Sequence, residues 1–299
     1  MHSRSRAGSR GCTCAGSPYS SSGSRCTSRC SPRSATVATP VYVPSLLLLG
    51  AAVVPVTFST FVVERNLSQR LSSGDLLAGA VLGGVIGAIV AGQLEFETMR
   101  ALGSLPTALI GLIEETAKLA VPAVLLAWRR PRAIDGLVLG VSVGSGFAAL
   151  ETMGYAFVEL LHSHGQLASV TSLLLLCAVA SPSGHAAWTG LACAALFAVR
   201  GARRRGLAWL HFLLVFAGVV VLHATWDSGV GAIGHLVVAG VSFGTLMLVA
   251  WRMHRAERRD GSGRQSVDLG LGAPELHQHL PAWRSAARGS HHVAEHRDQ

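Results

Sequence analysis

Residues 76–93 read LLAGAVLGGVIGAIVAGQ, eighteen residues without a charged side chain. A helix that spans a membrane needs about 20 predominantly apolar residues, because each residue adds only about 1.5 Å to its length. Apolar stretches of this kind recur along the chain, which predicts an all-α fold built as a polytopic transmembrane helix bundle. The candidate spans are Val41–Val63, Leu76–Gln93, Leu105–Trp128, Ile134–Leu161, Gly184–Ala198, Leu207–His223 and Ile233–Trp251.

One further apolar stretch is too short for a full span. Leu167–Ala180 covers 14 residues and is followed by Ser181-Pro182-Ser183-Gly184. A segment of this length is more typical of a half-helix or a re-entrant segment than of a transmembrane helix. We therefore expect seven or eight hydrophobic segments, with this one returning to the side of the membrane from which it enters.

Composition supports a membrane protein and divides the chain into three parts. Half of the 299 residues are hydrophobic, 14% are charged, and the mean hydropathy is +0.43. Soluble domains usually have about a quarter of their residues charged. We expect residues 1–40, rich in Ser, Arg and Cys, to be disordered or to precede the true start. Residues 41–252 form the predicted transmembrane domain, and residues 253–299 a disordered cytoplasmic tail.

The net charge of +9 does not indicate a nucleic-acid partner, because the arginines lie at the ends of apolar segments. Basic residues in such positions mark the cytoplasmic side of a membrane protein. The main clusters fall at 129–132, at 200–205 and after Arg252. We therefore expect the partner of this chain to be the membrane itself, with these clusters in the cytoplasm.

Residues 112–118, LIEETAK, bring ionisable groups into the middle of an apolar stretch. A charge at mid-helix costs about 2.5–3.5 kcal/mol on insertion scales, so such residues usually have a function. Glu114 and Lys118 are four residues apart and are expected to form an ion pair on one helix face. Glu115 projects about 100° further round the helix and is expected to have no local partner. A purely structural ion pair would explain only one of the two acids.

Three other predicted spans carry polar groups that can reach the same depth. Glu151 follows a face of small residues, His185 lies in the first turn of its helix, and His223 precedes Asp227 by one helical turn. At 1.5 Å per residue, Glu114 and Glu151 both lie about 15 Å from the same membrane face. The histidines can join them there, which predicts one shared site.

Paired glutamates and histidines suit hydrolysis. A carboxylate can activate water as a general base, while a histidine stabilises the oxyanion. A metal is the alternative, because His185, His223, Glu115 and Glu151 are acceptable zinc ligands and a bound metal activates water. An ion- or proton-coupled transporter also buries carboxylates and histidines at mid-membrane, so transport stays open as a different class of function.

Four motifs in order resemble the PrsW family of intramembrane proteases, which is similar to the CAAX prenyl protease and bacteriocin-processing membrane proteins. The motifs cover Leu105 to Ser228. They are Glu114-Glu115-x-x-Lys118, Asp135-Gly136 leading to Gly146-Phe147-Ala148-x-x-Glu151, Ser183-x-His185, and His223-x-x-x-Asp227. One departure is Thr152, where the family usually has Asn after the glutamate.

The resemblance implies a protease of the bacterial cell membrane that cleaves membrane-anchored protein substrates such as anti-sigma factors. It implies that Glu114 and Glu115 are the essential acids. It further implies that the site is completed by Glu151, His185 and His223, with support from Lys118, Asp227 and Phe147. In a metal-dependent enzyme, His185, His223 and Glu151 would be the ligands.

Overall fold

The structure is a computed structural model that describes residues 40–65, 70–128 and 132–268. Short turns connect helices in these residues, and no strand occurs among them, which confirms the all-α prediction. The helices are α1 (Val43–Glu64), α2 (Ser73–Leu102), α3 (Thr107–Lys118), α4 (Ala120–Trp128), α5 (Ala133–His162), α6 (Leu167–Ala180), α7 (His185–Gly201), α8 (Arg205–Asp227) and α9 (Gly231–Asp268), with short 3₁₀ turns η1 (Pro40–Tyr42) and η2 (Ser181–Ser183).

Six segments of the described chain are long and apolar enough to cross a membrane: α1, α2, α5, α8, α9 and the combined segment Leu167–Gly201. The helices α3 and α4 are each too short to cross alone. The protein is therefore an integral, multi-pass membrane protein, in agreement with the predicted polytopic bundle.

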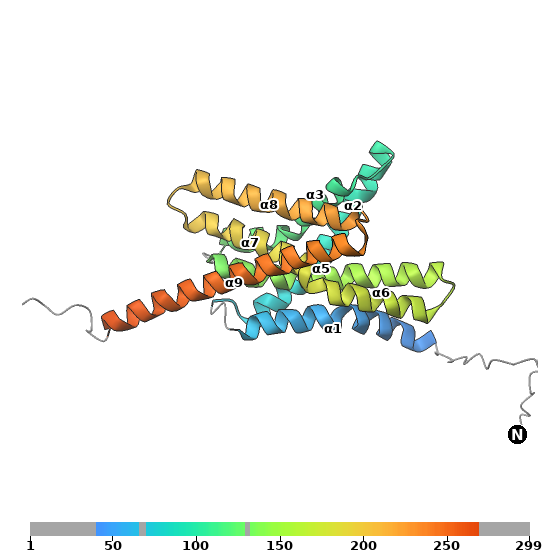
Figure 1. The fold of residues 1–299 in the computed structure, drawn as a ribbon, viewed down its shortest axis with the longest axis horizontal. Coiled ribbons are helices and arrows are strands. Elements are labelled where there is room, and N and C mark those ends of the chain that lie inside the picture. The colour runs from blue at the N-terminus through green and yellow to red at the C-terminus, as the bar shows by residue number, and fades with distance from the viewer. Residues whose placement is uncertain (1–39, 66–69, 129–131, 269–299) are drawn as a thin grey trace, which may run out of the picture. The chain divides into compact units, whose positions relative to one another are not determined.

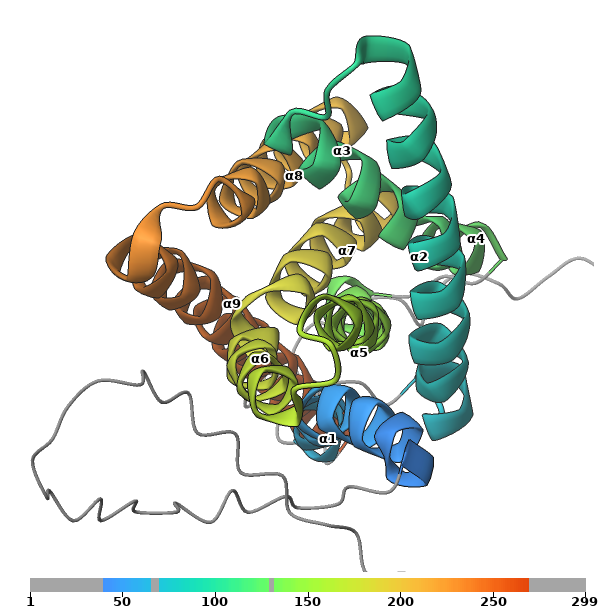
Figure 2. The same cartoon turned by 90° about the vertical axis from the view of Figure 1, so that its right-hand side faces the viewer.

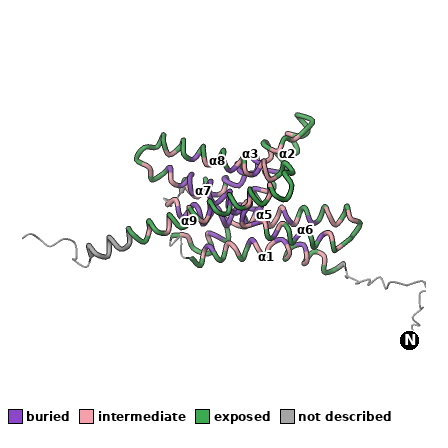
Figure 3. The backbone as a smooth tube through the Cα atoms, in the orientation of Figure 1, coloured by how far each residue is buried: buried purple, intermediate pink, exposed green. Residues whose placement is uncertain are grey.

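Helix α5 lies at the centre of the bundle, where α1, α2, α6 and α7 pack around it (Figure 2). Of its most apolar 18-residue window, 78% is buried, against 17–33% for the other five candidate spans. Figure 3 shows the same contrast, with buried residues concentrated in α5 and α7 and exposed residues along the outer helices. The outer apolar faces are those that meet lipid, because lipid tails solvate them as well as protein would.

Glycines allow the close approach of α7 and α2 to α5. A β-carbon at Gly144 would collide with the backbone oxygen of His185, and one at Gly146 would collide with the backbone oxygen of Ala80. Small residues at helix interfaces permit this backbone contact within membranes. The glycines of α5 therefore fix where α7 begins, and with it the position of His185.

One predicted span is wrong in its continuity. The stretch Leu105–Trp128 is not one helix, because the helix is interrupted at Leu119, between α3 and α4. Pro122 lacks an N–H, and its ring would clash with the carbonyl of Lys118 four residues earlier in a continuous helix. The Leu119 amide instead bonds the Thr116 oxygen, at 3.2 Å. The break thus comes directly after Lys118.

The predicted return of Leu167–Ala180 to its own side is also wrong. Helices α6 and α7 form one candidate span of 35 residues, interrupted by η2 and Gly184. Pro182 and the unusual backbone angles of Gly184 (φ −96°, ψ −122°) interrupt the helix without reversing it. His185 consequently lies at a helix start inside the bundle.

The sequence predicts disorder at both ends of the chain. Of the predicted disordered stretch 1–40, residues 1–39 lie outside the described residues, and Pro40 begins η1. The predicted tail from 253 onward begins as helix, since α9 continues to Asp268. Arg132 at the start of α5 forms an ion pair with Glu257 of α9, which holds this part of α9 against the basic end of the bundle.

Candidate active site within the helix bundle

Helix α3 supplies three buried ionisable residues: Glu114, Glu115 and Lys118. The Nζ atom of Lys118 donates to Glu114 Oε2 at 3.0 Å and to Glu115 Oε1 at 2.8 Å. The predicted pair of Glu114 with Lys118 is therefore present. The expectation that Glu115 has no local partner is wrong, because residues three apart are also neighbours on a helix and the lysine side chain reaches both.

The same ammonium group reaches α7. Lys118 Nζ lies 2.7 Å from His185 Nδ1 and 3.9 Å from the centre of the Phe147 ring. An ammonium has three hydrogens to donate and accepts none. The three hydrogens thus meet Glu114, Glu115 and His185, while the aromatic face of Phe147 covers the charge.

His185 connects this cation to Glu151 of α5. Because Lys118 can only donate, His185 Nδ1 accepts and its proton lies on Nε2. Nε2 is 2.6 Å from Glu151 Oε2, and the other oxygen of Glu151 accepts a hydrogen bond from the Tyr155 hydroxyl at 2.9 Å. The imidazole is therefore fixed in one orientation from both of its nitrogens.

His223 of α8 also contacts the glutamates, and its ring centre lies 5.1 Å from that of His185. Its Nδ1 is 2.9 Å from Glu115 Oε1, and its Nε2 is 3.3 Å from Asp227 Oδ2 and 3.5 Å from Glu114 Oε2. The indole of Trp188 stacks on the ring with centroids 4.7 Å apart. The predicted helical pairing of His223 with Asp227 is present, and a carboxylate faces each ring nitrogen.

The structure brings all eight candidate residues from the sequence into one cluster. These contacts join four carboxylates and one ammonium, so with neutral imidazoles three negative charges are uncompensated. Burying unpaired charge is costly, so this cluster favours an additional cation or protonated histidines. The candidate residues are Glu114, Glu115, Lys118, Phe147, Glu151, His185, His223 and Asp227.

Two polar residues at the cluster escaped the sequence analysis. Thr189 Oγ1 of α7 lies 3.5 Å from Glu115 Oε2. Glu95 of α2 lies within electrostatic range of Glu114, Glu151, His223 and Lys118, and within the described chain its buried Oε1 has no hydrogen-bond partner. The signal for Glu95 was its spacing, one helical turn after Ala91 on the face of α2 that packs against α3 and α5.

A serine motif in α5 does not contribute a nucleophile. Residues 140–144 read GVSVG, the spacing of the nucleophile elbow in serine hydrolases. That chemistry needs the serine exposed on a sharp turn between a strand and a helix. Ser142 is buried in mid-helix, and its hydroxyl donates to the backbone oxygen of Val138 at 3.1 Å.

A small cavity of about 90 Å³ adjoins the cluster, and His185, Glu151 and Asp227 form part of its wall. The side chain of Glu151 is 19% exposed and that of Asp227 is 27% exposed, whereas Glu115 is 1% exposed. The cluster thus has a closed interior around Glu115 and an accessible edge at Glu151.

Three of the residues could hold a metal ion. Ligand atoms of Glu114, His185 and His223 lie within 4.8 Å of one another. Two histidines and one glutamate are a donor set of catalytic zinc sites. The net negative charge of the cluster also fits a divalent cation. Glu151, expected from the sequence to be a ligand, instead contacts His185 Nε2, as carboxylates beside metal-bound histidines do.

A multi-pass helix bundle with an acid–histidine cluster buried among its spans is an architecture that intramembrane hydrolases and coupled transporters share. Residues 43–253 match the family model described as PrsW family intramembrane metalloprotease. This match covers more than half of the chain, and the chain belongs to the PrsW family. No curated protein and no solved structure matches it.

Proposed function

We propose that this protein hydrolyses peptide bonds of membrane-anchored proteins, with the acid–histidine cluster as its active site. The observation that carries the proposal is the 2.6 Å contact of His185 Nε2 with Glu151 Oε2 on the wall of a cavity inside the bundle. Membership of the PrsW family supports hydrolysis over ion- or proton-coupled transport. A bacterial cell membrane and anti-sigma-factor-like substrates are the setting that we propose.

Glu151 is the proposed general base, because it is the glutamate of the cluster that the cavity reaches. Its carboxylate takes a proton from water as the water oxygen forms a bond to the peptide carbonyl carbon. When the carbon–nitrogen bond breaks, the same proton passes to the leaving amine nitrogen. His185 holds the carboxylate in place through Nε2, and Tyr155 does so through its hydroxyl.

Without a bound metal, His223 is the proposed donor, through Nε2–H, to the oxyanion that forms on the carbonyl oxygen. Glu115 holds its Nδ1, and the stacked Trp188 fixes the plane of the ring. A donor that is already oriented stabilises developing charge without reorganisation during the reaction. Lys118 keeps Glu115 ionised and in position for this role.

Zinc is the metal that we propose, held by Glu114, His185 and His223. When bound, it would supply Lewis-acid chemistry in place of the His223 donor and would lower the pKa of a coordinated water. Glu151 and Glu115 would then orient the two imidazoles through their second nitrogens, as outer carboxylates commonly do.

The test is cleavage of a single-span reporter protein in proteoliposomes, with zinc present and the products identified by mass spectrometry. In H₂¹⁸O, the wild-type protein is expected to place one ¹⁸O atom in the new carboxylate. Glu151→Gln should lower the rate by about 10²–10⁴-fold. Glu97→Gln, an exposed glutamate of α2 paired with Arg100, is the matched control and should cleave normally. Normal cleavage by Glu151→Gln would remove Glu151 from the mechanism, and no cleavage by folded wild-type protein would overturn the function.

A further inference from the structure

The cavity beside Glu151 has a size and lining that suit one small side chain. Its volume is about 90 Å³. A cavity of about 150 Å³ is what holds benzene in a protein interior, and a water molecule has a share of about 30 Å³ in the liquid. An aromatic ring therefore does not fit here, whereas a side chain of one to three heavy atoms does.

The walls come from four parts of the fold. Ala148 and Thr152 of α5 and Cys177 and Ala180 of α6 contribute short side chains, and Trp226 of α8 contributes a flat aromatic surface. His185 and Glu151 lie on the same wall, so a side chain in the cavity would place its own backbone beside the proposed base.

We infer that this cavity selects the substrate residue next to the scissile bond and accepts only small side chains: Gly, Ala, Ser, Cys, Thr or Val. The inference rests on the proposed function, because it assigns the cavity to the same active site. Larger side chains exceed the volume of about 90 Å³ that Cys177 and Ala180 of α6 and Thr152 of α5 help to line.

The experiment compares reporters that differ only in the residues flanking the scissile bond. Wild-type protein should cleave the alanine and serine reporters at least about tenfold faster than the leucine and phenylalanine reporters, since hydrophobic pockets discriminate single groups by such factors. Cys177→Leu and Ala180→Leu, measured separately, should fill the cavity, retain cleavage of a glycine reporter and lose at least about tenfold on the alanine and valine reporters. Val179→Leu, on the exposed face of the same helix, is the matched control and should keep the wild-type profile.

The outcomes separate the two proposals. Equal cleavage of all reporters by the wild-type protein overturns the selective cavity and leaves proteolysis standing. If Cys177→Leu and Ala180→Leu both cleave the reporters with the wild-type preference, the selective cavity is likewise overturned and proteolysis stands. Failure of the wild-type protein to cleave any reporter overturns the proposed function itself.

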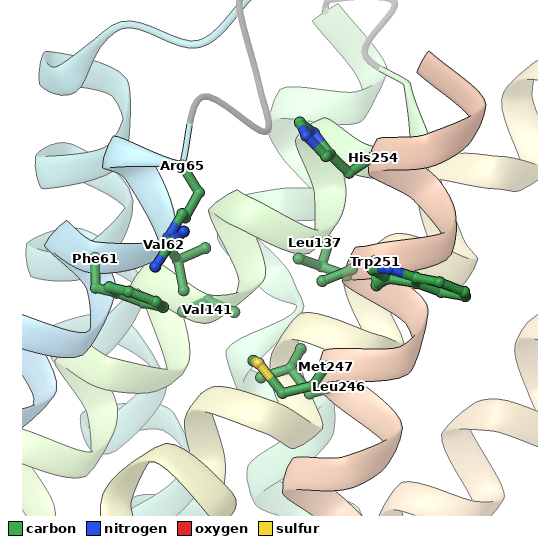
Figure 4. A pocket seen from close by; sticks show the side chains of 10 residues that line it. Phe61, Val62, Arg65, Leu137, Val141, Leu246, Met247, Trp251 and His254 are labelled. Atoms are coloured by element: carbon green, nitrogen blue, oxygen red, sulfur yellow. The ribbon is translucent and has the colours of Figure 1, made fainter. Parts of the chain in front are cut away.

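A second cavity, of about 270 Å³, lies away from the cluster between α1, α5 and α9 (Figure 4). Leu137 and Val141 of α5 form its buried floor, while Phe61 of α1 and Trp251 of α9 stand at its exposed sides. The rings of Phe58 and Phe243 approach to 6.2 Å where α1 and α9 meet. The cavity is thus an apolar cleft between two lipid-facing helices.

Basic groups stand at one end of this cleft. Arg65 and His254 both line it, and Arg258 Nε donates to His254 Nε2 at 2.9 Å. Arg65 stacks on Phe61 at 4.5 Å and has no ion pair with any described residue. This is the membrane end at which the arginine clusters lie, and that charge pattern marks the cytoplasmic side.

We propose that the cleft binds an anionic phospholipid, with an acyl chain against Leu137 and Val141 and the phosphate at Arg65 and His254. Basic pockets between transmembrane helices on the cytoplasmic side recognise anionic headgroups by charge. The cleft is a different surface from the active site, so this proposal is independent of the proposed function.

The probe is native mass spectrometry of the protein in mixed phosphatidylglycerol and phosphatidylcholine. The wild-type protein should retain phosphatidylglycerol, and the double variant Arg65→Gln/His254→Gln should lose about tenfold of that preference. Ala250→Phe should block the cleft from its apolar side and release the lipid. Arg100→Gln is the matched control, because Arg100 also stacks on a phenylalanine four residues earlier but lies at the opposite end of its membrane span. Equal retention of phosphatidylcholine, or equal loss in the control, would overturn the site.

Discussion

The ammonium nitrogen of Lys118 lies 2.7 Å from His185 Nδ1, so a cation carried by α3 contacts an imidazole that belongs to the candidate metal donors. The same ammonium also binds Glu114, a second donor of that set. Binding of a metal ion at His185 Nδ1 therefore requires this nitrogen, which has one lone pair, to exchange Lys118 for the metal, whereas the Glu114 carboxylate has lone pairs for both.

Replacing Lys118 tests this competition. Lys118→Met should bind zinc at least about tenfold more tightly, because a like charge a few ångströms from the ion is removed. Without zinc, the variant should be less stable by about 3–5 kcal/mol, because two buried glutamates lose their counter-ion. Thermal unfolding in detergent, with and without zinc, measures both effects. Arg100→Met, which removes an exposed ion pair, should change stability by no more than about 1 kcal/mol. Equal zinc affinity of Lys118→Met and the wild-type protein would show that Lys118 does not compete with the metal.

The two glutamates at the metal donors should differ when zinc is titrated. Glu114→Gln removes a proposed ligand and should abolish saturable zinc binding at micromolar concentrations. Glu151→Gln removes only the partner of His185 Nε2 and should weaken binding by about 10–100-fold while keeping one zinc per chain. Calorimetry and elemental analysis of the purified variants decide between them. The reverse order would restore the ligand set expected from the sequence, in which Glu151 binds the metal.

The depth of the site could be predicted from the sequence because each residue of a helix adds a constant rise of about 1.5 Å. Counting residues from the span ends placed Glu114 and Glu151 at one level, and in the structure His185 bonds Glu151 and Lys118 together. The candidate donor set of the structure, which contains Glu114 beside His185 and His223, could not be predicted. It depends on which way each side chain points around its helix after packing, and spacing along the sequence does not fix that.

The continuity of the helices was harder to predict, because hydropathy does not register a break inside an apolar stretch. Pro122 ends α3 directly after Lys118, and Pro182 and Gly184 interrupt α6–α7 directly before His185. Both breaks lie beside a site residue. The sequence predicted the second break, since it ended one segment at Ser181-Pro182-Ser183-Gly184 and placed His185 in a first helical turn. It missed the first break, for which Pro122, four residues after Lys118, was the signal.

The glycine contact between α5 and α7 should be essential for the position of His185. In Gly144→Ala the new methyl group meets the backbone of His185 and Ala186, which cannot move aside as a side chain would. Overpacking of this kind costs about 1–3 kcal/mol and displaces the imidazole. Gly154→Ala is a matched control on the same helix, since nothing lies within 4 Å of its β-carbon. Reporter cleavage and thermal stability should fall in Gly144→Ala and stay unchanged or rise in Gly154→Ala. Equal behaviour of the two variants would mean that α7 does not depend on this contact.

A substitution of Glu95 tests whether the excess negative charge of the cluster lowers the stability of the folded protein. Its buried Oε1 lacks a hydrogen-bond partner among the described residues, and the charges within its range include Glu114 and Glu151. Glu95→Gln keeps the shape and removes one charge, so the metal-free protein should gain about 1 kcal/mol in stability. The exposed variant Glu97→Gln should stay within about 0.5 kcal/mol of the wild-type value. Unfolding in denaturant, measured for both variants without metal, gives the comparison. A loss of stability in Glu95→Gln would mean that the Glu95 carboxylate has a favourable partner in the folded protein. The excess negative charge of the cluster would then not destabilise the fold at this position.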